Sequence, residues 1–150
     1  MNLSIDIVRL PHAADLPLPD YATDGAAGMD AHAAVDVPLT IAAGGIVMVP
    51  TGLQVAIPRG FELQVRSRSG LAAKHGVFAL NAPGTVDSDY RGEIKVIMAN
   101  MGSADFVIER GMRIAQFVVA QHEHVMWNVV DALDTTARGE GGFGSTGVQP

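Results

Sequence analysis

Two aspartates and a tyrosine fall together in one glycine-flanked stretch, residues 81–92, where they could do chemistry. Asp87, Asp89 and Tyr90 can supply a general base or a metal ligand, or they can simply form a turn, since Asx residues beside glycine are common in hairpins. A lone carboxylate has a reference pKa of roughly 4 and is a weak base. Activating a water here would therefore require a desolvated pocket or a substrate that holds the water close.

A second stretch, residues 66–71, reads Arg-Ser-Arg-Ser-Gly-Leu and could bind an anion. We expect a helix of one or two turns over residues 70–74, entered from Ser69, whose hydroxyl would accept a hydrogen bond from a free amide of the first turn. Such a helix start presents amides and a positive dipole end to a phosphate, beside Arg66 and Arg68. The alternative is that both arginines are surface positions at the end of a strand and that Ser69 only caps the helix.

The glycine-rich tail, residues 138–147, invites comparison with a phosphate-binding loop. Gly139 and Gly144 have the right spacing, but Ser145 stands where the lysine belongs, and too few residues follow for a helix. Glycine amides, hydroxyls and Arg138 can still wrap an oxyanion, and Phe143 could stack on a ring. The alternative is a disordered, solvated tail.

Four polar residues outside these stretches complete the candidates. Asp30 ends the otherwise apolar run of residues 26–30, so it faces solvent or lies near a metal. Gln116 lies inside an apolar strand pattern, and a buried glutamine needs partners, so it faces either solvent or a ligand. His122 and His124 resemble a two-histidine metal pair, but nothing nearby in the sequence supplies a third ligand.

Composition limits the classes of protein that carry these residues. The 150 residues are 48% hydrophobic and 17% charged, which excludes intrinsic disorder and favours subunits that bury faces against one another. Ten Lys and Arg against sixteen Asp and Glu give a net charge of −6, so we expect no general binding of nucleic acid. The chain has no cysteine, which excludes disulfides and thiolate chemistry. We expect a soluble cytoplasmic protein without a signal peptide or membrane span.

The elements that position these residues are predicted to be short strands. Seventeen glycines and eight prolines separate short segments rich in Val, Ile and Phe, many with period-two alternation. Phe61, Leu63 and Val65 should share one face, and residues 93–99 suit a strand buried on both sides. The pattern predicts an all-β sandwich, jelly roll or barrel. The expected strands are residues 3–8, 45–49, 53–57, 61–65, 93–99, 106–108 and 113–119.

Five stretches in this order resemble the five motifs of the trimeric dUTPase family, over essentially the whole chain. They are Ala-Ala-Gly-Met-Asp (26–30), Arg-Ser-Gly-Leu-Ala (68–72), Asn-Ala-Pro-Gly-Thr-Val-Asp-Ser-Asp-Tyr-Arg-Gly (81–92), Arg-Ile-Ala-Gln (113–116) and Arg-Gly-Glu-Gly-Gly-Phe-Gly-Ser-Thr-Gly (138–147). The resemblance implies an all-β jelly-roll (β-clip) subunit with one very short helix, formed by residues 1–134. Residues 135–150 would form a flexible arm of the same domain. Three subunits would form a homotrimer whose three active sites lie at subunit interfaces.

The resemblance also implies Mg²⁺-dependent hydrolysis of dUTP to dUMP and pyrophosphate, which removes dUTP and supplies dUMP for dTTP synthesis. Asp87 would orient and deprotonate the attacking water, and Tyr90 would pack under the deoxyribose and exclude a 2′-hydroxyl. Asp30 would touch the magnesium through water. The uracil and sugar would be bound by Asn81, Gly84, Thr85, Val86 and Asp87, with Lys95 lining the pocket through its backbone. The phosphates would be bound by Arg68, Ser69, Gly70 and Gln116, and the arm would close over them through Arg138, Phe143 (on the uracil), Gly144, Ser145 and Thr146.

Two other functions remain open on the same fold. A dCTP deaminase would need a site built to attack the cytosine ring and would release ammonia. A catalytically silent nucleotide-binding or protein-interaction module would be free to lose Asp87, which is present here.

Overall fold

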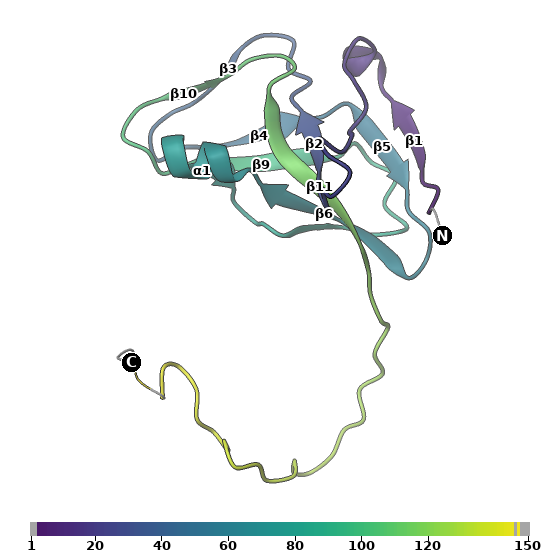
Figure 1. Ribbon diagram of the computed structural model, residues 1–150, viewed down its shortest axis with the longest axis vertical. Helices are drawn as coiled ribbons and strands as arrows, with labels where there is room; N and C mark the ends of the chain where they lie inside the picture. Colours follow the sequence, from purple (N-terminus) through teal and green to yellow (C-terminus); the bar gives the residue numbers. More distant parts are fainter. Residues whose placement is uncertain (1–2, 146, 148–150) are drawn as a thin grey trace.

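Short antiparallel strands are the main secondary structure of the computed structural model, which describes residues 3–145 and 147 (Figure 1). The elements are β1 (Asp6–Arg9), the 3-10 helix η1 (Pro11–Ala13), β2 (Met29–His32), β3 (Leu39–Ile41), β4 (Ile46–Pro50), β5 (Leu53–Ala56), β6 (Phe61–Ser67), α1 (Ser69–His75), β7 (Val77–Ala79), β8 (Gly84–Val86), β9 (Lys95–Asn100), β10 (Phe106–Ile108) and β11 (Arg113–Gln121). The expected all-β subunit with one very short helix is confirmed.

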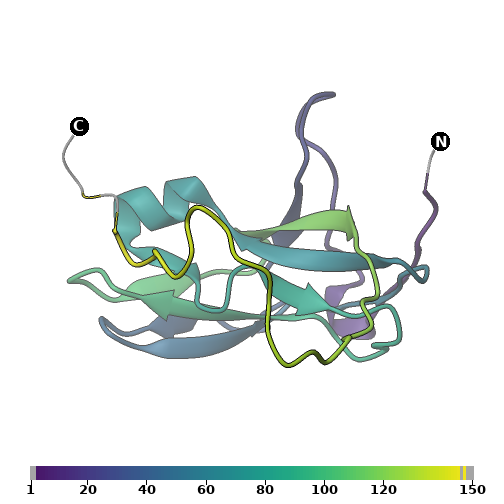
Figure 2. The same ribbon diagram turned by 90° about the horizontal axis from the view of Figure 1, so that it is seen from below.

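The strands form small sheets that stack in two layers, seen edge-on in Figure 2. One sheet has the order β2-β11-β6-β8 and a second has the order β4-β9-β7, while β1 pairs with β5 and β10 pairs with β3. All of these pairings are antiparallel. β11 lies between β2 and β6, and this central position brings residues 26–30, 66–68 and 113–116 into one neighbourhood.

The core between the layers is almost entirely aliphatic. Leu63 and Val65 are buried and Phe61 packs against them, as the alternation predicts. Phe117 of β11 is the one aromatic side chain among the fully buried large residues. On β9, Val96 and Met98 are buried while Ile97 is half-buried, so one face of the strand is fully covered and the other partly covered. One face of each strand is therefore used by the core, and only side chains on the other face are available to bind a ligand.

The strand and helix boundaries differ from expectation in several places. β2, β3, β7 and β8 are strands that the sequence pattern did not predict, because each has only three or four residues and is too short to show a clear alternation. The prediction that Ser69 is the N-cap was wrong. Ser69 is the first helical residue, and Arg68 occupies the cap position in extended conformation without a side-chain cap hydrogen bond. β6 runs to Ser67, so Arg68 alone connects this strand to α1. The Arg68 side chain donates a hydrogen bond to Asp30.

After β11 the chain leaves the body and runs in a wide arc, coloured green to yellow in Figure 1. Residues 123–140 are all exposed, and Arg138 makes only a local bond within the arm, from Nε to the Gly141 carbonyl at 2.7 Å. The body thus ends near Gln121, and the division at residue 134 stays a prediction. Among the described residues, no helix is long and apolar enough to cross a membrane.

Candidate active site

Asp30 is the centre of a polar cluster on the sheet formed by β2, β11 and β6. Its Oδ1 accepts a hydrogen bond from Arg68 Nε at 3.0 Å, and its Oδ2 accepts one from Arg113 Nη1 at 3.2 Å. Asp30 is only 8% exposed, and the two guanidinium groups compensate its buried charge. Because two arginines surround one carboxylate, the cluster keeps a net positive charge that suits an anion.

The strand register explains why Gln116 joins this cluster. Gln116 lies opposite Asp30 on β2 and opposite Arg66 on β6, so these three residues share one face of the sheet. A Cβ at Gly28 would lie 3.3 Å from the Gln116 side chain, so a larger residue at position 28 would crowd it. The structure thus brings together Asp30, Arg68 and Gln116, which the sequence analysis selected from three separate stretches.

Arg113 is the member of the cluster to which the sequence analysis gave no role. It lies three residues before Gln116, so regular strand alternation would place the two side chains on opposite faces. The pairing of β11 with β2 shifts between Arg113 and Ala115, and this irregularity brings Arg113 to Asp30. Its place as the first residue of the fourth motif, residues 113–116, was the signal that could have assigned it a role.

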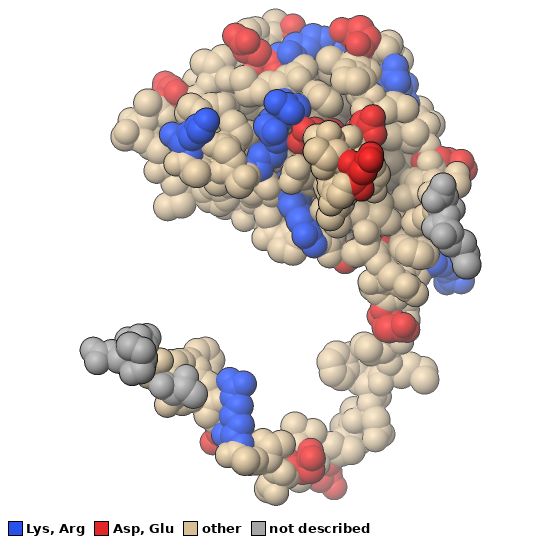
Figure 3. All heavy atoms as spheres, viewed as in Figure 1, with Lys and Arg blue, Asp and Glu red and all other residues tan. Residues whose placement is uncertain are grey.

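Basic side chains lie over α1 and β11 on the face seen in Figure 3. Ser69 and Gly70 are exposed at the start of α1, beside the half-buried Arg68. Near this cluster, burial lowers the pKa of His32, while the negative charge of Asp30 opposes that shift and the positive charges of Arg113 and Arg68 add to it. The buried Nδ1 of His32 has no hydrogen-bond partner among the described residues. The positive charge at this site comes from the arginines.

A separate cavity of about 470 Å³ contains the residues of the third predicted stretch. A cavity of this size is within the range that small-molecule ligands occupy. Asp87 is exposed at its wall, and the Tyr90 phenol donates a hydrogen bond to the Glu93 carbonyl at 3.0 Å. The lining residues are Met48, Thr85, Val86, Asp87, Tyr90, Glu93, Ile94, Lys95 and Ile97. The sequence analysis missed Met48, Glu93, Ile94 and Ile97, which lie on β4 and β9 or directly before β9 and are hydrophobic or acidic residues without a recognisable site pattern.

Asn81 lies on the turn that leads into β8, and Gly84 is the first residue of that strand. Gly84 is buried and pairs with Val65 of β6. A Cβ on Gly84 would lie 3.1 Å from the Asn81 amide nitrogen, so a larger residue at position 84 would press on the Asn81 side chain. Asn81, at the mouth of this hairpin, is exposed and free to meet a ligand.

The candidate residues therefore fall into three groups. None of the residues around the cavity of Asp87 belongs to the cluster of Asp30, Arg68, Arg113 and Gln116. In the arm, Phe143, Gly144 and Ser145 are exposed, and Thr146 lies outside the described residues.

Comparison with known proteins identifies the family. The sequence profile of the dUTPase family matches residues 14–147. The chain is 60% identical over 131 residues to a deoxyuridine 5′-triphosphate nucleotidohydrolase of Rickettsia bellii (strain OSU 85-389), covering 87% of each chain. It is 55% identical over 145 residues to the enzyme of the same name from Anaplasma marginale (strain St. Maries), covering 97% of this chain and 99% of that one. The chain belongs to the dUTPase family.

Solved dUTPase structures share the fold. The dUTPase of Staphylococcus bacteriophage 80alpha with dUPNHPP superposes with a TM-score of 0.87 at 22% identity, covering 98% of this chain and 100% of that one. A mutant dUTPase from phage phi11 of S. aureus, described for its coordination of a structural Mg(II) ion, gives a TM-score of 0.78 at 17% identity. That comparison covers 89% of this chain and 100% of the phage chain. These likenesses confirm the jelly-roll fold of the chain.

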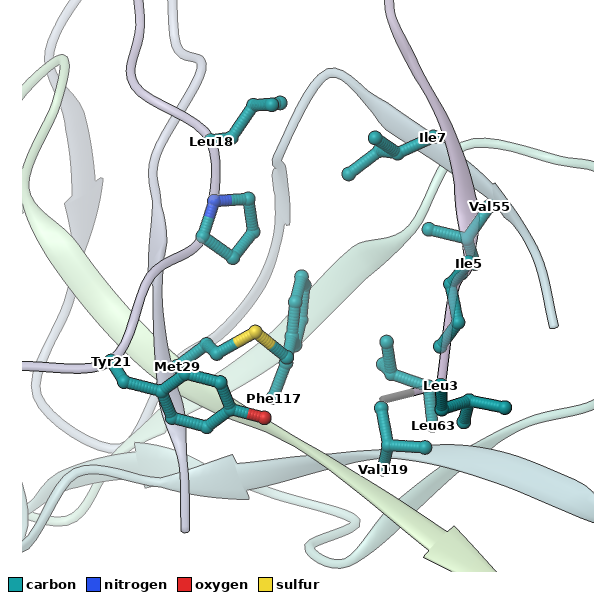
Figure 4. Close-up of a pocket in the computed structure, with 11 residues that line it drawn as sticks. Leu3, Ile5, Ile7, Leu18, Tyr21, Met29, Val55, Leu63, Phe117 and Val119 are labelled. Atoms are coloured by element: carbon teal, nitrogen blue, oxygen red, sulfur yellow. The ribbon is translucent and has the colours of Figure 1, made fainter. Parts of the chain in front are cut away.

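An apolar groove of about 560 Å³ lies elsewhere on this dUTPase subunit (Figure 4). Side chains from β1, β5, β6 and β11 converge there with Leu18 and Tyr21 of the chain before β2. The lining contains no charged residue, so the groove does not suit a triphosphate.

The described residues contain no cluster of three His, Cys, Asp or Glu side chains that could hold a metal ion. The rings of His122 and His124 lie 5.2 Å apart, beyond the end of β11, without a third ligand. Mg²⁺ usually keeps several waters and is bound through one or two carboxylates and substrate phosphates. A single carboxylate such as that of Asp30 fits an ion of that kind, which would arrive with the nucleotide.

Proposed function

We propose that this protein is a dUTP diphosphatase that hydrolyses dUTP at the α-phosphorus to dUMP and pyrophosphate. The observation that carries the proposal is the cavity lined by Asp87 and Tyr90, in a chain 60% identical to a deoxyuridine 5′-triphosphate nucleotidohydrolase. The reaction removes dUTP from the nucleotide pool and supplies dUMP for dTTP synthesis. We place it in the cytoplasm, where free nucleotides are its substrate.

The cavity binds the nucleoside in this proposal. Asn81 and the main chain of Gly84, Thr85 and Val86 contact the uracil and the sugar, because a hairpin backbone can match the imide edge of the base. A cytosine amino group would face the wrong partner there and leave a polar group unpaired. Tyr90 packs under the deoxyribose and excludes a 2′-hydroxyl. Lys95 lines the cavity through its backbone.

The cluster of Asp30, Arg68, Arg113 and Gln116 binds the triphosphate. Arg68, Ser69 and Gly70 contact the phosphate oxygens, with Gln116 beside them on the same sheet face. Phosphoryl transfer needs charge neutralisation and alignment more than covalent chemistry, and guanidinium groups and helix-start amides supply both. Mg²⁺, when bound with the nucleotide, would supply further compensation of the triphosphate charge. Asp30 would hold that ion through a water molecule while it keeps Arg68 in place.

Asp87 performs the one proton transfer in this reaction. Its carboxylate orients a water and takes its proton as the water oxygen attacks the α-phosphorus. The bond from the α-phosphorus to the bridging oxygen breaks, and pyrophosphate leaves with the electron pair. The exposed position of Asp87 beside the cavity gives the water access to both the base and the substrate.

The active enzyme is a homotrimer in this proposal, with each site at a subunit interface. The lining of the Asp87 cavity shares no residue with the cluster of Asp30, Arg68, Arg113 and Gln116. This supports sites at interfaces, since one subunit would supply the nucleoside pocket and another the phosphate site. Further support comes from apolar surface that an isolated chain leaves in water. This surface includes the groove of Figure 4 and the exposed side chains of Val125, Met126, Trp127, Val129, Val130 and Leu133.

The arm closes the site. Its exposed glycine-rich chain makes few contacts with the rest of the protein, as expected of a lid that becomes ordered when the ligand binds. Arg138, Gly144, Ser145 and Thr146 contact the outer phosphates, and Phe143 stacks on the uracil. Release of pyrophosphate frees the arm.

A nucleotide panel tests the proposal. The purified protein is incubated with each deoxynucleoside triphosphate and with UTP, with and without Mg²⁺, and pyrophosphate, monophosphate and ammonia are measured. We expect pyrophosphate from dUTP alone, lost on chelation. Ammonia from dCTP would instead indicate a deaminase, and release from several nucleotides would indicate a broader pyrophosphatase. Binding of dUTP without turnover would indicate a silent nucleotide-binding module.

A further inference from the structure

Glu93 is a cavity residue to which the proposed reaction assigns no role, although its carboxylate is among the most constrained in the molecule. Its side chain is only 16% exposed. One oxygen, Oε1, accepts a hydrogen bond from the Gly52 amide at 2.8 Å and lies 2.8 Å from His12 Nε2. The other, Oε2, lies 4.0 Å from Lys95 Nζ. Three segments far apart in the sequence therefore meet at one carboxylate.

The main chain of the same residue holds the tyrosine of the cavity. The carbonyl of Glu93 accepts the hydrogen bond from the Tyr90 phenol at 3.0 Å. The phenol lies tightly over the intervening glycine, because a Cβ on Gly92 would come within 2.3 Å of its oxygen. Tyr90 is 45% exposed, so packing alone does not fix its ring. The hydrogen bond to Glu93 is what sets the direction of the phenol.

The frame that holds Glu93 is rigid. In the next residue, the Ile94 amide donates to the Leu53 carbonyl at 2.8 Å, and Thr51 Oγ1 donates to the Ile94 carbonyl at 2.6 Å. Gly52 has a positive φ of 67°, and a Cβ there would lie 2.1 Å from that of Ala13, so η1 packs directly on this turn.

The carbonyl of His12 itself accepts a hydrogen bond from Arg110 Nη2 at 2.7 Å. The histidine that meets Glu93 is thus fixed at its main chain as well as at its ring. Arg110 is thus connected to Glu93 through His12 of η1, and the amide of Gly52 contacts the same carboxylate.

We propose that Glu93, held by His12 and the Gly52 amide, is a positioning residue that orients Tyr90 and thereby sets the selectivity of the pocket for deoxyribose. The inference rests on the proposed function, since Tyr90 must face the sugar for its direction to matter. The carboxylate fixes the path of residues 92–94, and that path places the carbonyl to which Tyr90 bonds. Loss of the carboxylate frees the ring and opens space for a 2′-hydroxyl.

The test compares Glu93→Ala, Glu93→Gln and His12→Ala in the full-length protein, by steady-state pyrophosphate release from dUTP and from UTP with Mg²⁺. We expect Glu93→Ala to lower the ratio of kcat/KM for dUTP to that for UTP by about tenfold, the size expected for a hydrogen bond to a charged group. Glu93→Gln keeps an acceptor for the Gly52 amide, so its ratio should fall by less than that of Glu93→Ala. His12→Ala should also fall between the wild type and Glu93→Ala.

A matched control is Glu109→Ala, which removes an exposed carboxylate just beyond β10 and should leave the ratio unchanged. A double-mutant cycle then asks whether Glu93 acts through Tyr90. In a Tyr90→Phe background the phenol hydrogen bond is absent, so Glu93→Ala should cost far less selectivity than in the wild type.

Thermal unfolding of every variant separates positioning from folding. A lowered Tm with an unchanged dUTP-to-UTP ratio in Glu93→Ala and His12→Ala would show that Glu93 is only structural and would overturn the inference. Equal losses in the wild-type and Tyr90→Phe backgrounds would overturn it as well. Failure of the proposed function looks different, because the wild-type protein itself would then release no pyrophosphate from dUTP. Should Glu93→Ala not fold, Glu93→Gln and His12→Ala carry the same comparison.

Discussion

Asp30 and Arg68, 38 residues apart in the sequence, are joined by a hydrogen bond of 3.0 Å between Oδ1 and Nε. The contact connects β2 to the residue that precedes α1. Arg113 of β11 completes the arrangement from the other side of the carboxylate. The cationic groups assigned to the triphosphate are thus positioned by one buried acid.

Replacing Asp30 with Asn should weaken both the fold and the site. The substitution removes the charge to which both arginines donate hydrogen bonds, which should lower the free energy of unfolding by about 2 kcal/mol, the size of a hydrogen bond to a charged group. Arg68 should also lose its orientation, and kcat/KM for dUTP should fall by about tenfold. Urea unfolding and pyrophosphate release measure the two effects. Asp6→Asn, an exposed position on β1, is the control; an equal effect there would contradict the prediction.

Replacing Asp87 with Asn should remove turnover and keep substrate binding. Asparagine has nearly the same shape, but it cannot accept a proton from water, so kcat should fall by roughly 10²- to 10⁴-fold. Calorimetric titration with a non-hydrolysable dUTP analogue should give an affinity close to that of the wild type. Asp89→Asn changes a neighbouring exposed carboxylate and should retain most of the activity. If turnover persists in Asp87→Asn, another group is the base.

Deleting residues 135–150 should leave a folded protein with greatly reduced turnover. The described residues of this segment are almost all exposed, so the core loses nothing on truncation. The site, however, loses the groups that close over the phosphates. Thermal unfolding should match that of the full-length chain while kcat/KM drops, and light scattering reports the oligomeric state. Unchanged turnover would contradict the role of the arm.

The exposed pair of Asp15 and Arg110 should add stability at neutral pH and lose it in acid. The hydrogen bond from Arg110 holds the pKa of the Asp15 carboxyl below its usual value of 3.8. Because the folded-state pKa is the lower one, the contribution is present above pH 3.8 and is lost as the pH falls through the folded-state value. Asp15→Asn should therefore lower the urea midpoint slightly at pH 7, and the difference should shrink toward pH 3. A difference that grows in acid would contradict the assignment.

Much of the fold could be predicted from the chain because alternation in a strand is a local property. Leu63 and Val65 face the core as their spacing predicts, and residues 106–108 form a strand with the expected bounds. Ser69 shows the limit of local reasoning. A serine before a helical run is a good cap in isolation, but β6 continues to Ser67, and the helix begins one residue earlier than expected.

Some residues of the candidate site could likewise be selected from the sequence, and others could not. The order and spacing of five motifs, from Asp30 to the glycine-rich arm, were enough to identify the family and to select Asp87, Tyr90, Arg68 and Gln116, because those residue types suit phosphate and nucleoside chemistry. Arg113 and Glu93 could not be selected. Arg113 reaches Asp30 through an irregularity in strand pairing, and Glu93 meets His12 across 81 residues.

The sequence by itself therefore determined which groups are present, their chemistry and the all-β class, since these depend on residue type and local period. Only the tertiary structure decided which groups meet. It placed β11 between β2 and β6, gathered the arginines around Asp30 and left Asp87 at a separate cavity. Contacts between distant segments depend on strand register and on the closing of the core, and a one-residue shift in register turns every side chain to the other face.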